Sequence, residues 1–152
     1  MSLYAIALFV HIVGALLLFA LLTLEGVALR VRIAAAPMGR TLGPISALAI
    51  LIPGVYMMAT QWGVKGWIAV GITSWVLIAV GGAATGISAM RGRIGTRAAT
   101  ISWLARIGMA LGVVFDMTLK PDTLVGVVAV LVGLVVGVSA ATLVTPRPQR
   151  SL

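Results

Sequence analysis

Five long apolar runs limit what this chain of 152 residues can fold into. Each run holds about 20 mostly apolar residues, the length that an α-helix needs to cross the hydrocarbon core of a bilayer. The runs are continuously apolar and do not alternate apolar with polar residues, so a transmembrane β-barrel is a poor alternative. The sequence therefore predicts an all-α polytopic membrane bundle that forms one domain over residues 1–152.

Charged residues, Pro and Gly mark the ends of the predicted helices, which are expected at residues 3–29, 42–62, 67–90, 101–119 and 123–145. The fourth helix contains Arg106 and, near its end, Asp116, each of which costs about 2.5 to 3.5 kcal/mol at a bilayer centre. A second interpretation therefore stays open, in which residues 101–119 lie along the membrane surface. The distribution of charge between the connections favours five spans over four.

The composition excludes a water-soluble globule, because 61% of the residues are hydrophobic and only 9% are charged. The net charge of +8 does not indicate nucleic-acid binding, since the basic residues form short clusters between apolar runs and no extended stripe. The sequence contains no cysteine, which excludes disulfides and thiolate metal sites. The expected surroundings are the lipid bilayer, and the frequent use of Arg, Ala, Gly and Val suggests a bacterial inner membrane.

Arginines lie after the first, third and fifth predicted helices, whereas the other two connections carry one lysine each. Because positive charge is retained in the cytoplasm, this pattern predicts an outside N-terminus and a cytoplasmic C-terminus. Aromatic residues agree with it, with Tyr4, Trp62 and Trp67 at the predicted outer boundary and Trp103 near the inner one. The predicted cytoplasmic cations are Arg30, Arg32, Arg40, Arg91, Arg93, Arg97, Arg147 and Arg150, and the outer ones are Lys65 and Lys120.

Small residues recur every four positions, a spacing that lets helix backbones approach closely in lipid. We expect each stripe to face another helix, either within the bundle or in a homo-oligomer or larger membrane complex. The predicted packing residues are Gly82, Gly86, Gly108, Gly112, Ala129, Gly133, Gly137 and Ala141. Pro53 and Gly54 are predicted to break the second helix, a feature that lines substrate sites in some transporters.

The single histidine, His11, lies within the first predicted helix. An ionisable group at this depth is a functional candidate, and imidazole can ligate haem iron or copper or relay a proton. The alternative is a neutral histidine that is hydrogen-bonded to a neighbouring helix. A second haem ligand would have to come from a methionine such as Met57, Met58 or Met117, from a second copy, or from a partner protein.

Two ion pairs are expected, because pairing lowers the cost of placing charge in the membrane. Glu25 and Arg106 are predicted at similar depth on the first and fourth helices. Asp116 and Lys120 lie four residues apart on one helix and are predicted to pair along its face. The sequence contains neither a Ser/His/Asp set nor a phosphate-binding glycine loop, and we expect no catalysis by this chain alone.

The segments FVHIVGA (residues 9–15) and MTLKPD (residues 117–122) resemble the opening helix and the Lys-Pro junction of a family of small predicted integral membrane proteins, domain of unknown function 2269. The opening helix also resembles that of copper-resistance-D-type membrane proteins. The resemblance implies a small bacterial inner-membrane protein, and for the copper-resistance type only His11 carries over.

The leading hypothesis is a non-enzymatic accessory or scaffold subunit of a membrane complex. The alternatives are an electron-transfer component that binds haem or a metal through His11, and a small-solute transporter.

Overall fold

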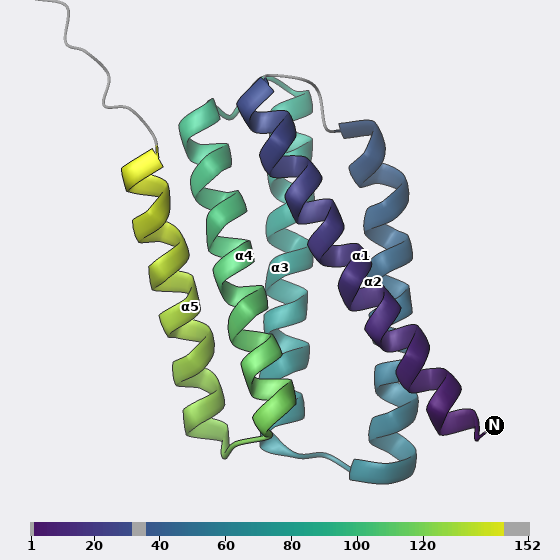
Figure 1. The fold of residues 1–152 in the computed structure, drawn as a ribbon. Helices are drawn as coiled ribbons and strands as arrows, with labels where there is room; N and C mark the ends of the chain where they lie inside the picture. Colours follow the sequence, from purple (N-terminus) through teal and green to yellow (C-terminus); the bar gives the residue numbers. More distant parts are fainter. Residues whose placement is uncertain (1, 32–35, 145–152) are drawn as a thin grey trace, which may run out of the picture.

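The computed structural model describes residues 2–31 and 36–144, which form the five helices drawn in Figure 1. All five are long and apolar enough to cross a membrane, which confirms the predicted all-α class. Their bounds are α1 (Leu3–Val31), α2 (Ala36–Met57), α3 (Gly66–Met90), α4 (Thr96–Leu119) and α5 (Thr123–Val144), and a short π-helix, η1 (Met58–Trp62), continues α2.

Two helices begin earlier than predicted. The second begins at Ala36 and not at residue 42, so that Arg40 lies within it, and the fourth begins at Thr96 and not at residue 101. Both helices extend beyond the apolar run that was used to predict them. This is possible because a helix can continue from the hydrocarbon core into the headgroup region with its polar residues exposed. The predicted helix end at Thr145 and the cations Arg32, Arg147 and Arg150 lie outside the described residues.

The bundle consists of a three-helix layer and a hairpin. Helices α3, α4 and α5 lie side by side with α4 in the middle, and α1 packs along α2 (Figure 1). The contacts between these two units are much less extensive than the contacts within them. Figure 1 shows α1 running obliquely to the layer, with its N-terminal end displaced from α4, and α1 contacts α4 in its second half, at Leu22 and Glu25.

The position of α4 argues against a helix that lies along the membrane surface. It runs antiparallel to α3 and α5 (Figure 1), and 39% of its most apolar 18-residue window is buried, the largest share of the five helices. Its charged residues Arg106 and Asp116 face neighbouring helices. Burial between neighbours thus explains how the least apolar segment takes the central place in the layer.

Small residues hold α4 against α5. Gly108 and Gly133 approach so closely that a Cβ on either would overlap the carbonyl of the other. A Cβ on Gly112 would lie 2.6 Å from the Cα of Val130, and one on Gly137 would overlap the carbonyl of Leu104. The stripes of α4 and α5 therefore pack against each other inside this chain, as small-residue contacts do in membrane helices.

The third stripe, on α3, behaves differently. Gly82 lies beside the Arg106 guanidinium, whereas a Cβ on Gly86 would meet nothing within 4 Å. The expectation that each stripe faces another helix is therefore wrong for Gly86 within the described residues. The open space beside this half-buried glycine agrees with the position of α3 at the edge of the layer.

The predicted helix break at Pro53 and Gly54 is also wrong, since α2 continues through both residues to Met57. A proline removes one backbone hydrogen bond without ending a helix that neighbours support. The departure from α-helical geometry comes later, at Met58–Trp62, where the chain widens into a π-helix and then turns at Gly63 with φ 63°. Gly54 has a different use, because its missing side chain leaves room for the ring of His11.

These contacts predict opposite outcomes for two glycine substitutions. Gly108→Ala should lower the free energy of unfolding by about 1 to 3 kcal/mol, because the new methyl group forces α4 and α5 apart. Gly86→Ala meets open space and should leave stability unchanged or raise it by up to about 1 kcal/mol. Unfolding of the detergent-solubilised variants, followed by circular dichroism, measures both. Equal effects of the two substitutions would contradict the assigned α4 and α5 contact.

Candidate functional site

The candidate site is a cavity of about 480 Å³ between the hairpin and the three-helix layer. This volume lies within the range of small-molecule sites in proteins. Four helices and η1 line the cavity, mostly with apolar side chains. Along α1 the lining extends from Tyr4 to Phe19, which is about 22 Å of helix at 1.5 Å per residue. The cavity is therefore elongated along the helices.

Polar side-chain links join the hairpin to the layer near one end of the bundle, the chain itself connects η1 to α3 at the other end, and the cavity lies between the two units. Near the end of the bundle that carries the exposed residues Arg30, Arg91, Arg93 and Arg97, here called the arginine end, α1 contacts α4 through two polar links. Toward the opposite end, here called the tryptophan end and marked by Tyr4, Trp62 and Trp67, α1 diverges from α4 (Figure 1). The divergence leaves space between them.

The first link is the predicted ion pair of Glu25 and Arg106, which the structure brings together. Arg106 donates to both carboxylate oxygens, with 2.9 Å from Nη1 to Oε2 and a second bond from Nη2 to Oε1. The Arg106 side chain is 8% exposed and Glu25 is 21% exposed, so water screens the pair poorly. Such two-pronged pairing satisfies a charge that would be costly in the membrane interior.

The second link is Trp103, which was predicted near the inner boundary and packs between α1 and α4. Its Nε1 donates to the carbonyl of Leu22 at 2.6 Å, and its ring occupies the space where Gly26 lacks a side chain. The Trp103 ring fits here because of a glycine 77 positions away in the sequence. The position of Trp103 along its own helix therefore does not predict this contact.

His11 lies on the cavity wall and is held by α2. Its Nδ1 is 2.8 Å from the carbonyl oxygen of Ile50. Because a carbonyl can only accept, Nδ1 carries the proton, and in the neutral ring Nε2 is left as an acceptor. Nε2 has no hydrogen-bond partner among the described residues.

The His-x-x-Gly spacing has a structural reason. Gly14, one turn after His11, meets the backbone of Ala49 and Ile50 so closely that its Cβ would lie 2.8 Å from the carbonyl carbon of Ala49. This close approach of α1 and α2 brings the ring of His11 to the Ile50 carbonyl. Met57, Met58 and Met117, the candidate second ligands, line the same cavity as His11.

The tryptophan end of the cavity, where the lining residues Trp62 and Lys120 are exposed and which is here called the mouth, carries one cation and two indole rings. Lys120 Nζ lies 3.8 Å from the ring centroid of Trp62 and 5.7 Å from that of Trp67. The two rings meet edge to face, with centroids 5.7 Å apart. Attraction between an ammonium group and the face of an indole stabilises this arrangement.

The predicted ion pair of Asp116 and Lys120 is wrong. Lys120 ends α4 in the left-handed conformation, with φ 48°, which turns its side chain away from the helix face and onto the indole rings. Asp116 points instead toward α5, where a Cβ on Gly126 would overlap its Oδ1. The four-residue rule assumes that both residues continue the same helix, and Lys120 does not.

Asp116 is fully buried, with 0% of its surface exposed, and neither carboxylate oxygen has a hydrogen-bond partner among the described residues. It is not among the residues that line the cavity. An unpartnered buried carboxyl group is costly, and this one stands apart from the otherwise satisfied polar groups of the described bundle.

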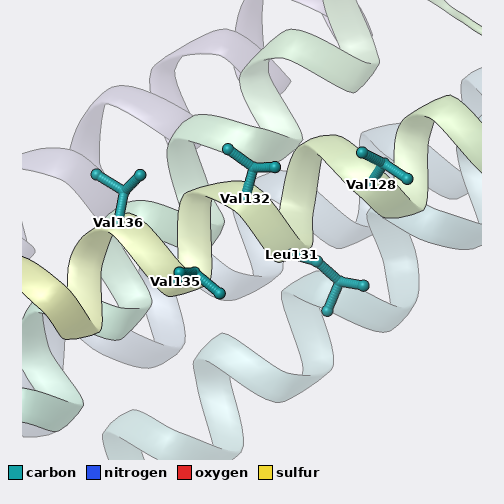
Figure 2. A pocket seen from close by; sticks show the side chains of 5 residues that line it. All are labelled: Val128, Leu131, Val132, Val135 and Val136. Carbon is teal, nitrogen blue, oxygen red and sulfur yellow. The ribbon is translucent and has the colours of Figure 1, made fainter.

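A second hollow, of about 280 Å³, lies on the outer face of α5. Figure 2 shows its lining, in which every side chain comes from this one helix and is aliphatic. It is shallow and contains no polar group, so it is a lipid-facing surface without features for recognition. The lining residues are Val128, Leu131, Val132, Val135 and Val136.

Neither models of protein families, nor curated proteins, nor solved structures match this chain. The resemblance of residues 9–15 and 117–122 to a family of predicted membrane proteins therefore stays a prediction.

The link between Glu25 and Arg106 can be measured with a double-mutant cycle. Glu25→Gln should lower the free energy of unfolding in detergent by about 3 kcal/mol, since it leaves the Arg106 charge buried and unpaired. Adding Arg106→Gln should cost much less than the sum of the two single changes. Arg97→Gln, which removes an exposed arginine of α4, should change stability by less than about 0.5 kcal/mol. Additive single effects would show that the pair does not join α1 to α4.

Proposed function

We propose that this chain is a non-enzymatic multi-pass protein of the bacterial inner membrane, and that it binds a membrane-dissolved, chain-like ligand in the cavity between α1, α2, α3 and α4. The observation that carries the proposal is the shape of the site. It is elongated along the helices and mostly apolar in its lining, and the helices around it carry many exposed apolar side chains. A hydrocarbon chain gains burial there at little cost in desolvation.

The structure weakens the other two uses considered for the bundle. The small-residue stripes of α4 and α5 pack against each other within this chain, so these two stripes do not support an accessory subunit that docks on a partner. Helix α2 continues through Pro53, so the broken helix that suggested transport is absent from the described residues. The transport role thereby loses the feature that motivated it, whereas the accessory role keeps the α3 stripe at Gly86, where an added Cβ would meet nothing within 4 Å.

The proposed orientation places the arginine end in the cytoplasm and the N-terminus outside. The arginines at positions 30, 91, 93 and 97 are exposed near this end, whereas Lys65 and Lys120 lie at the other. The positive-inside rule favours this arrangement. The mouth of the cavity then lies at the outer leaflet.

Photo-crosslinking tests the proposal. A phospholipid with a photoactivatable chain, supplied in nanodiscs, should label peptides that line the cavity, and Ala15→Phe should reduce that labelling several-fold because the ring fills the cavity. Labelling of the outer face of α5 reports contact with bulk lipid and should not change. Val132→Phe adds the same ring to that outer face and should leave the cavity labelling intact. Absence of cavity labelling in the wild-type protein would refute the proposal.

A second candidate function is binding of haem or of a metal through His11. The observation that favours it is the free Nε2, because a ligating histidine commonly donates its other ring nitrogen proton to a carbonyl. Methionines on the same cavity wall offer a further ligand. The site then serves a cofactor in place of a lipid chain.

The absorption spectrum of the protein purified from membranes distinguishes the two candidates. Haem binding predicts a Soret band that disappears in His11→Ala and is weakened when Met117 is replaced by Leu, which keeps the apolar volume and removes the sulfur. A spectrum without a Soret band, together with metal analysis that finds no stoichiometric metal, would exclude this function for the purified chain.

A further inference from the structure

We infer that the ligand of the cavity is a phospholipid with net negative charge, with its phosphate held at Lys120, no headgroup cation to compete with the lysine, and one hydrocarbon chain extending along α1 toward Phe19. This inference rests on the proposed function and adds the chemistry of the headgroup. It follows from the conformation, the surroundings and the charge of Lys120.

The first observation is the backbone of Lys120. It is the only residue other than glycine with positive φ in the described part of the chain. A helix commonly ends in this conformation with glycine, because a side chain there is disfavoured. The conformation turns the lysine side chain off the axis of α4 and across the mouth, where it contacts Trp62 and Trp67. A costly conformation that aims one side chain into a site indicates a functional role.

The second observation is that no acid neutralises this cation. The Asp116 carboxyl group faces α5, and the Asp122 carboxylate accepts the backbone N–H of Val125 at 3.0 Å, which caps the start of α5. Lys120 makes no ion pair among the described residues. Its charge is therefore available to an anion outside the chain.

The third observation is the level of the mouth in the membrane. Tryptophan and tyrosine gather where the hydrocarbon core meets the headgroups, and Tyr4, Trp62 and Trp67 lie together at this end. Lipid phosphates lie at the same level, so a lipid can place its phosphate on the ammonium group without leaving the bilayer. The cavity beneath is mostly apolar and accepts a chain. Charge at the mouth and apolar lining below together match one amphiphile.

The test compares phosphatidylglycerol with phosphatidylcholine, each with the same photoactivatable chain, in phosphatidylcholine nanodiscs. Cavity labelling is divided by labelling of the outer face of α5. The wild-type protein should prefer phosphatidylglycerol by about fivefold, the factor that corresponds to ~1 kcal/mol for one lysine near anionic lipid. Lys120→Gly should abolish the preference while keeping or raising thermal stability, because glycine suits the left-handed conformation. Lys120→Arg should keep the preference, and so should Lys65→Gln, which removes the other described lysine at the same end.

The outcomes separate the two proposals. Equal cavity labelling by both lipids, or an unchanged preference in Lys120→Gly, would overturn the headgroup inference while the proposed chain-binding function stands. Stronger cavity labelling by a photoactivatable fatty acid than by phosphatidylglycerol would replace the phosphate by a carboxylate and also overturn the inference. Failure of every probe to label the cavity would overturn both proposals.

Discussion

The close approach of α4 to α5 at Gly108 and Gly133 is the contact on which the rest of the bundle depends. In lipid there is little hydrophobic gain between helices, so association relies on packing at short range. Backbone against backbone gives that packing, and it fixes a layer in which α4 is central. With α4 enclosed by α3 and α5 on its sides, Arg106 is left to face the hairpin.

The hairpin is then joined to the layer by polar groups that the layer cannot satisfy by itself. Arg106 takes Glu25 as its counter-charge, and Trp103 donates to the Leu22 carbonyl. Both links lie toward the arginine end. Toward the tryptophan end, α1 and α4 diverge. The cavity is thus a consequence of where the bundle can place its charges, because burying an unpaired charge is more costly than leaving an apolar space for lipid.

Much of this architecture could be predicted from the sequence. The five apolar runs gave the number of helices, and the matching depths of Glu25 and Arg106 gave their pairing, because depth in a bilayer is encoded in position along a helix. Contacts that depend on two distant positions could not be predicted. The contact between Trp103 and Gly26 is one example, because no residue near Trp103 in the sequence indicates it. The left-handed end of α4 is another, because it falls on Lys120 and not on a glycine that would mark the helix end, and Lys120 was therefore paired with Asp116. The cavity could not be predicted from the sequence, because it arises from the angle between the α1–α2 hairpin and the three-helix layer.

In the proposed function, the bundle has a packed layer, an end at which polar groups join the hairpin to this layer, and an end that receives lipid. An experimental density map of the protein in phosphatidylglycerol-containing nanodiscs tests this most directly. We expect elongated density that begins at Lys120 and continues along α1 toward Phe19, with α1 held away from α4 at the tryptophan end. A map in which α1 and α2 close onto α3 and α4 and leave no space between them would contradict it.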